Sequence, residues 1–338
     1  MHAENKQIRL TAGEIGQLWG QYLNDTASTC ILTYFLEKVE DSEIKPIIQY
    51  ALEISTSHVQ KITSILKDEK YVIPKGFNIE EDADLHAPRL YSDSFVLNFL
   101  NQMSKVGLTS YAGSVGTSVR SDIKSYYMDC LKETMQLYDK TTELLLSKGL
   151  FIRSPSLPNL EKVEFVKKQR FMLDVFGEKR PLVATEVDHL FANMQRNALG
   201  IATLTGFSQV AKDKDVKQFF LKGLEIGTKH VKLFRGKLEE AKLPAPMGWD
   251  SEITNSTANT FSDKLMMFFT NGLIPLSIGY YGTAVSLSLR GDLVAMYNRL
   301  SLEVQMYAED GANIMIKNKW LEQPPMASDR DELIRNKK

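Results

Sequence analysis

Two histidines and three acidic residues occupy positions that the sequence assigns to the interior of helices. His58 and His230 each fall on an apolar stripe with the three- and four-residue spacing of a buried helix face. Glu133 and Glu303 interrupt similar stripes, and Asp25 lies on the inward face of residues 11–39. Imidazole and carboxylate groups are ligands for transition metals, and they also pair with one another when they are buried.

The helix pattern predicts that these side chains meet in one layer. A turn near residue 41 folds Asp25 and His58 to a similar height, and a crossover connection brings Glu133 to that height as well. The equivalent positions in the second half of the chain are Asn197, His230 and Glu303.

Three kinds of chemistry are compatible with the predicted layer. A diiron site needs two Glu-x-x-His motifs, which the chain lacks, because Glu53 and His58 are five positions apart. A mononuclear iron or zinc site in each bundle remains open, with Asp25, His58 and Glu133 as candidate ligands in the first and His230 and Glu303 in the second. A ligand-binding or catalytic role is a further alternative. We favour a buried histidine hydrogen-bonded to a glutamate, which fixes the helix register without a metal or other cofactor.

The chain is an internal duplication. At an offset of 172 residues, Glu14 aligns with Glu186 and His58 with His230, and the offset falls to 170 after a loop that contains proline and glycine. The later matches include Ser92 with Ser262, Tyr111 with Tyr281, Arg120 with Arg290, and Glu133 with Glu303. The seam lies around residues 154–158, so we expect two domains, residues 1–155 and 156–338.

Each half predicts four helices. The first extends from a capping box at Thr11 and Glu14 to about residue 39, and from about residue 185 to residue 210 in the repeat. The second ends near residue 67 or 238, and the third and fourth begin near residues 92 and 122, or 262 and 292. The short and long connections predict an all-α fold of two tandem ferritin-like four-helix bundles.

The third helix of each half is rich in small residues. This pattern indicates either close helix packing, which we favour, or a pocket for a ligand between the helices. The residues are Ser104, Gly107, Ser110, Gly113 and Gly116, and in the repeat Ser277, Gly279 and Gly282.

Composition and charge exclude several classes of protein. The 338 residues include 41 Lys and Arg against 42 Asp and Glu, and a net charge of −1 argues against a nucleic-acid partner. Cys30 and Cys130 are too few for a disulfide framework, and no secretory signal is recognisable, so we expect a cytoplasmic protein. Residues 265–289 carry no charge, but glycine and proline interrupt them, so we expect a buried helix and no membrane span.

These features resemble a family of unknown function from endospore-forming bacteria. The resemblance rests on the duplicated bundles, the paired histidines, Pro74-x-Gly76 before the crossover, and Arg120-x-Asp122 before the fourth helix. The family consists of spore-coat-like proteins with ferritin-like bundles, loosely similar to spore coat protein F. The resemblance implies the fold but no activity and no catalytic residues.

Three functions are compatible with this reading. We favour a non-catalytic structural or interaction protein, associated with the spore or with stress, that binds itself or other spore or stress proteins. The second candidate is a degenerate ferritin-like metal-binding protein or oxidase with a His/carboxylate site in each bundle. The third is a helical bundle that binds an apolar small molecule between its helices.

Overall fold

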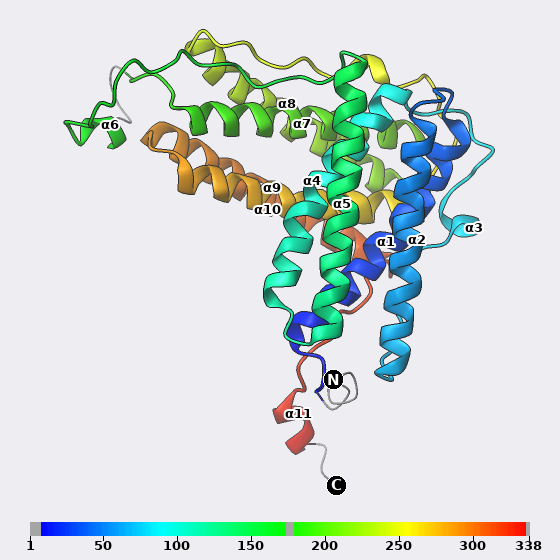
Figure 1. Cartoon of the computed structure of the whole chain (residues 1–338). Helices are drawn as coiled ribbons and strands as arrows, with labels where there is room; N and C mark the ends of the chain where they lie inside the picture. Colours follow the sequence, from blue (N-terminus) through cyan, green and yellow to red (C-terminus); the bar gives the residue numbers. More distant parts are fainter. Residues whose placement is uncertain (1–7, 174–178, 336–338) are drawn as a thin grey trace.

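The computed structural model describes residues 8–173 and 179–335, and over these residues it confirms an all-α chain of two four-helix halves. The first half contains α1 (Ala12–Lys38), α2 (Lys45–Asp68), α4 (Asp93–Thr117) and α5 (Ser121–Ser147). The second contains α7 (Ala184–Val210), α8 (Lys214–Glu240), α9 (Asp263–Leu287) and α10 (Gly291–Lys317). The short segments are α3 (Ile79–Asp82), α6 (Arg170–Leu173), η2 (Asp250–Glu252) and α11 (Arg330–Arg335). In Figure 1 the first-half helices stand upright and the second-half helices lie across them.

The helices begin where the sequence supplies side chains that cap them. The Ser92 hydroxyl accepts a hydrogen bond from the Phe95 N–H, and the Ser262 hydroxyl accepts one from the Leu265 N–H, both at 3.0 Å. These bonds satisfy N–H groups that have no partner within a helix. Both pairs of third and fourth helices therefore start within a residue or two of the predicted positions.

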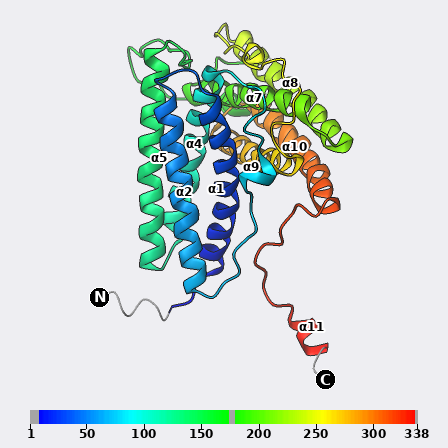
Figure 2. The same ribbon diagram turned by 90° about the vertical axis from the view of Figure 1, so that its right-hand side faces the viewer.

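A long crossover connects the two hairpins of each bundle. In the first half, Glu69 at the end of α2 pairs with Arg120 at 2.6 Å, at one end of the bundle. At the other end, the Asp93 carboxylate at the start of α4 accepts a hydrogen bond from the Asp41 N–H at 2.8 Å. Residues 69–92 must therefore run the length of the bundle, as Figure 2 shows, and α2 and α4 point in the same direction.

The crossover segments of the two halves pair with each other and relate the bundles by an approximate two-fold axis. Isolated antiparallel bridges join Ala83 to Phe261 and Tyr91 to Ile253. Ala83 is equivalent to Ile253, and Tyr91 to Phe261, at the 170-residue offset of the repeat. The two bridges are therefore the same contact made twice, as in an interface between identical subunits.

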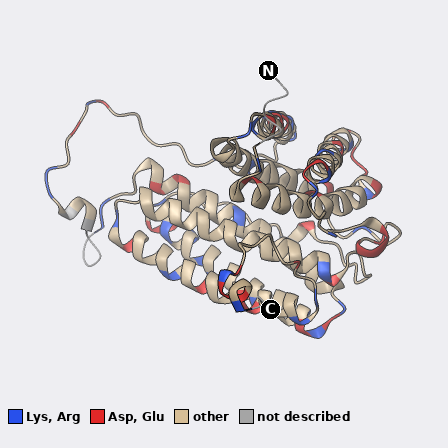
Figure 3. Cartoon of the chain, turned by 90° about the horizontal axis from the view of Figure 1, so that it is seen from below, with Lys and Arg blue, Asp and Glu red and all other residues tan. Residues whose placement is uncertain are grey.

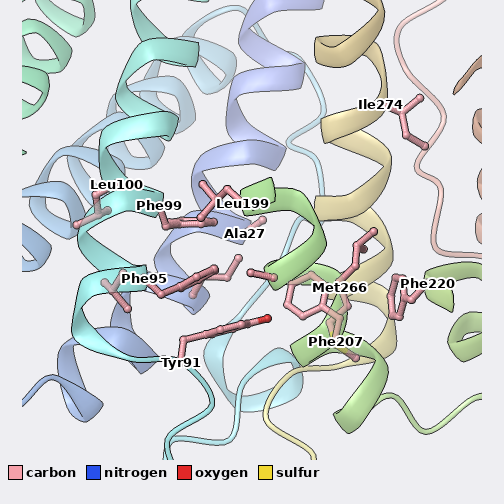
Figure 4. Close-up of a cluster of buried hydrophobic side chains, with 14 of the residues drawn as sticks. Ala27, Tyr91, Phe95, Phe99, Leu100, Leu199, Phe207, Phe220, Met266 and Ile274 are labelled. Carbon is pink, nitrogen blue, oxygen red and sulfur yellow. The ribbon is translucent and has the colours of Figure 1, made fainter. Parts of the chain in front are cut away.

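One hydrophobic core continues across both bundles. The equivalent residues Phe99 and Phe269 stack on each other with their ring centroids 5.4 Å apart. Figure 4 shows side chains of α1 and α4, among them Ala27 and Phe99, close to Phe207 of α7 and Met266 of α9. Because the apolar surface of each half is buried against the other, the two bundles form a single body.

The distribution of charged residues on the surface does not distinguish one half from the other. Acidic and basic residues are intermixed along the helices in the view of Figure 3.

The C-terminal tail contacts the first half, where the Glu322 carboxylate accepts hydrogen bonds from the N–H groups of Lys75 and Gly76, both at 2.8 Å. Among the described residues, no helix combines the length and the apolar character needed to cross a bilayer.

In each bundle, a buried glutamate at the start of the first helix accepts hydrogen bonds from the connection between the third and fourth helices. Glu14 is fully buried, and one of its carboxylate oxygens accepts hydrogen bonds from the N–H groups of Val119 and Arg120 at 2.9 and 2.8 Å. Its other oxygen accepts from the Thr11 N–H at 2.8 Å, completing the predicted capping box. Glu186 makes the equivalent bonds in the second half. The glutamate of the predicted capping box therefore also links the first hairpin of the bundle to the second through hydrogen bonds.

We expect the change Glu14→Gln to lower the free energy of unfolding by about 1 to 3 kcal/mol, because an amide leaves buried N–H groups poorly paired. Burial alone would raise the pKa of Glu14, but the backbone hydrogen bonds lower it below its ordinary value of 4.5. The stabilisation is therefore complete above pH 4.5 and disappears as the pH falls below it. Urea denaturation from pH 3 to pH 7 measures the difference, with exposed Glu37→Gln as the control. Equal stability of the two variants at pH 7 would contradict this role.

Candidate metal centre

The structure brings the predicted polar layer of the first bundle together. His58 of α2 is 3 % exposed and lies between two carboxylates. Its Nε2 atom is 2.9 Å from Oε2 of Glu133 on α5, and its Nδ1 atom is 3.3 Å from Oδ2 of Asp25 on α1. The juxtaposition of Asp25, His58 and Glu133 expected from helix heights is therefore confirmed, while their role as metal ligands stays a prediction.

Cys130 joins this layer, and sequence reasoning assigned it only to the apolar core. Its sulfur, a ring nitrogen of His58 and a carboxylate oxygen of Glu133 all lie within 4.8 Å of one another. Cys130 is 1 % exposed, whereas the Glu133 side chain is 38 % exposed and leads from the layer to solvent. The spacing Cys130-x-x-Glu133 places both side chains on one helix face and is the signal that could have identified the group.

Several polar atoms around the layer have no hydrogen-bond partner among the described residues. They belong to residues that are at least nine-tenths buried, where an unpaired polar atom is costly. Asp25 Oδ2 and His58 Nδ1 lie close together but are not aligned for a hydrogen bond. The other unpaired atoms near them are Gln21 Oε1 and the hydroxyls of Tyr126 and Tyr127.

In the equivalent layer of the second bundle both ring nitrogens of the histidine are hydrogen-bonded, although Asn193 Nδ2 and the Tyr297 hydroxyl have no partner among the described residues. His230 Nε2 is 3.0 Å from Glu303 Oε2, and Lys229 donates to the other Glu303 oxygen at 2.7 Å. His230 Nδ1 bonds to the Tyr281 hydroxyl at 3.0 Å, and Asn197 donates to that hydroxyl at 2.9 Å. Asn197 thus reaches His230 only through Tyr281, and Leu300 stands where the first bundle has Cys130.

The two equivalent histidines have pKa values shifted in opposite directions. Burial lowers the pKa of His58, but the proximity of Asp25 and Cys130 outweighs it and raises the pKa to about 11. Burial also lowers the pKa of His230, and there the Glu303 carboxylate does not compensate. The first layer holds a proton tightly, and the second contains a neutral imidazole at pH 7.

A two-metal centre does not fit the residues that the structure describes. Glu53, the carboxylate nearest to His58 along α2, is exposed and accepts a hydrogen bond from Gln49. Over residues 8–173 and 179–335, the cluster with three metal-ligating side chains is His58, Cys130 and Glu133. This donor set suits one ion and not a bridged pair.

Comparison with known proteins identifies the family. Residues 1–163 and 170–333 each match the family described as "Protein of unknown function (DUF3231)", and the chain belongs to this family. The two matches confirm the duplication and the resemblance to a family of unknown function. Among solved structures, the chain is similar to a protein of Bacillus halodurans C-125 provisionally assigned as a spore coat protein. The identity is 18 % and the TM-score 0.43, over 46 % of this chain and 100 % of that one. No curated protein matches the chain.

Removing one carboxylate tests the origin of the histidine contrast. In metal-free protein at pH 8, we expect His58 to carry a proton on both ring nitrogens and His230 on one. The change Asp25→Asn lowers the pKa of His58 toward that of His230, because it removes the charge beside Nδ1. Two-dimensional NMR of the histidine ring nitrogens measures both residues in one sample, with His230 as the internal control. A His58 titration that is the same in Asp25→Asn would refute the assignment.

Proposed function

We propose that the protein binds one zinc ion in its first bundle through His58, Cys130 and Glu133. The supporting observation is that nitrogen, sulfur and oxygen donors lie within 4.8 Å of one another. Apart from Glu133, the side chains of this layer are buried. Asp25 acts as a positioning residue beside the imidazole. The second bundle keeps the same architecture as a structural counterpart without a metal.

The donor types favour zinc over harder cations. Thiolate and imidazole are preferred ligands of Zn²⁺, whereas Mg²⁺ and Ca²⁺ select oxygen donors. Three protein ligands leave a fourth position of a tetrahedral site for water or for a nearby oxygen donor. The partly exposed Glu133 side chain provides the route by which an ion reaches the layer.

A bound cation also accounts for the unpaired His58 Nδ1 and Asp25 Oδ2. When a metal occupies the Nε2 side of an imidazole, the Nδ1 atom keeps its proton and donates it to a carboxylate in many zinc sites. Asp25 Oδ2, 3.3 Å from His58 Nδ1, is placed to accept that hydrogen bond after a small adjustment. The positive ion further offsets the two carboxylates that face the ring.

This proposal departs from the interpretation favoured from the sequence, in which the buried histidine pairs with a glutamate without a metal or other cofactor. A zinc ion that joins α2 to α5 is compatible with a non-catalytic structural or interaction protein. The family resemblance adds the expectation of a protein associated with the spore or with stress, and the cysteine usage and lack of a recognisable secretory signal add that of a cytoplasmic one. An oxidase is less well supported, because the ligands of a diiron centre do not assemble among the described residues.

Metal analysis of paired variants tests the zinc site. After stripping with a chelator, reloading with zinc and desalting, we expect about one zinc per chain with an apparent Kd below about 1 µM. His58→Gln and Cys130→Ser reduce the content to below about a tenth of an equivalent, because each removes one of three ligands. The matched changes His230→Gln and Leu300→Ala leave it unchanged.

Circular dichroism distinguishes loss of metal from loss of fold. Cys130→Ser changes one atom, so its helix content should equal that of the parent protein. Zinc that is lost on desalting from the parent, or retained equally by Cys130→Ser, would overturn the proposal.

A further inference from the structure

A second, chemically different site lies between the bundles. A partly open cavity of about 130 Å³ is lined by α4 of the first half and by α7 to α10 of the second. Its walls are mainly apolar, and they include Met103, Leu199, Ile201, Leu204, Leu273 and Ile274. An apolar cavity of roughly 150 Å³ is large enough to hold benzene, so this space suits a hydrocarbon group of similar size.

One cation in the wall of this cavity has no acidic partner among the described residues, and a second lies nearby. Arg196 lines the cavity, with its guanidinium 3.7 Å from the centre of the Tyr280 ring and donating a hydrogen bond to Asn193 Oδ1 at 3.3 Å. Lys105 of α4 is not a lining residue; its ammonium lies 5.9 Å from the ring centre of Phe151, and its pKa responds to the charge of Arg196. Across the described parts of the chain, neither cation forms a salt bridge, although both are partly buried.

The two charges repel each other in a poorly solvated place. Burial and, to a smaller extent, the charge of Arg196 lower the pKa of Lys105 to about 8. Burial likewise lowers the pKa of Arg196. The charge of Asp188 acts on both in the opposite direction but does not pair with either. An anion in the cavity beside Arg196 would therefore gain a charge-assisted hydrogen bond, and the nearby positive charge of Lys105 would add to the attraction.

We infer that the cavity binds a small monocarboxylate with an apolar tail of roughly six to eight carbons. The tail occupies the space lined by leucine, isoleucine and methionine, and the carboxylate pairs with Arg196, with Lys105 as a second positive charge nearby. A planar guanidinium matches the two oxygens of a carboxylate. This site is independent of the proposed zinc layer, because it lies against the second bundle, where His230 and Asn197 form part of the wall.

Gly200 offers a way to fill the cavity without removing a contact. It lines the cavity from within α7, and a Cβ atom added to it meets nothing within 4 Å. The change Gly200→Leu therefore places a side chain in the space expected for the ligand tail. Gly113 of α4 also has open space around it but does not line the cavity, so Gly113→Leu is the matched control.

Calorimetric titration of the full chain with sodium octanoate tests the inference, with octan-1-ol as the neutral probe of equal length. We expect saturable binding of octanoate at one site and at least tenfold weaker binding of octan-1-ol. Arg196→Gln and Lys105→Gln each weaken octanoate at least fivefold without affecting octan-1-ol. Gly200→Leu abolishes octanoate binding, and Gly113→Leu preserves it.

Three results would overturn the inference. They are no saturable octanoate binding up to 1 mM, equal affinity for octanoate and octan-1-ol, or unchanged octanoate affinity in Gly200→Leu. Thermal unfolding of each variant shows whether its fold is intact, and Lys105→Gln serves as the charge test if Arg196→Gln unfolds. The metal content of the same samples reports on the zinc layer separately.

Discussion

The need to satisfy ionisable groups inside a dry helical bundle is the constraint on which this structure depends. A buried imidazole requires partners on both ring nitrogens, because an unpaired polar atom in the interior is costly. His230 finds them in Glu303 and the Tyr281 hydroxyl. His58 faces two carboxylates and a thiol, and several atoms around it lack hydrogen bonds. Both ring nitrogens of the histidine are therefore hydrogen-bonded in the second half, whereas in the first half the Nδ1 atom has no partner among the residues that the structure describes.

The duplication makes this difference informative, because the two halves share the hydrogen bonds and backbone contacts that hold the helices in place. Glu14 and Glu186 tie equivalent hairpins, and the crossover segments pair reciprocally about an approximate two-fold axis. These repeated features serve the architecture. The layer departs from the repeat where Asp25 and Cys130 replace an asparagine and a leucine. Neighbouring positions differ as well, since Gln21, Ile62 and Tyr126 correspond to Asn193, Phe234 and Met296, so the change of two donors is part of a wider divergence of this layer.

Much of the fold and part of the site could be predicted from the sequence. Helix periodicity and capping residues locate the helices, and the repeat shows which positions are equivalent. Relative helix heights then place Asp25, His58 and Glu133 together. Cys130 was missed because a thiol fits an apolar stripe as well as a leucine does. The cavity could not be predicted, since α4 of one half and helices of the other form it, and periodicity does not specify how bundles dock.

The coordination shell of the bound metal tests the central claim most directly. X-ray absorption at the zinc edge of the loaded protein should show one sulfur at about 2.3 Å together with nitrogen and oxygen at about 2.0 Å. The sulfur contribution identifies Cys130, because the other cysteine, Cys30, lies in the main hydrophobic core away from the layer. A shell of nitrogen and oxygen alone would contradict the account.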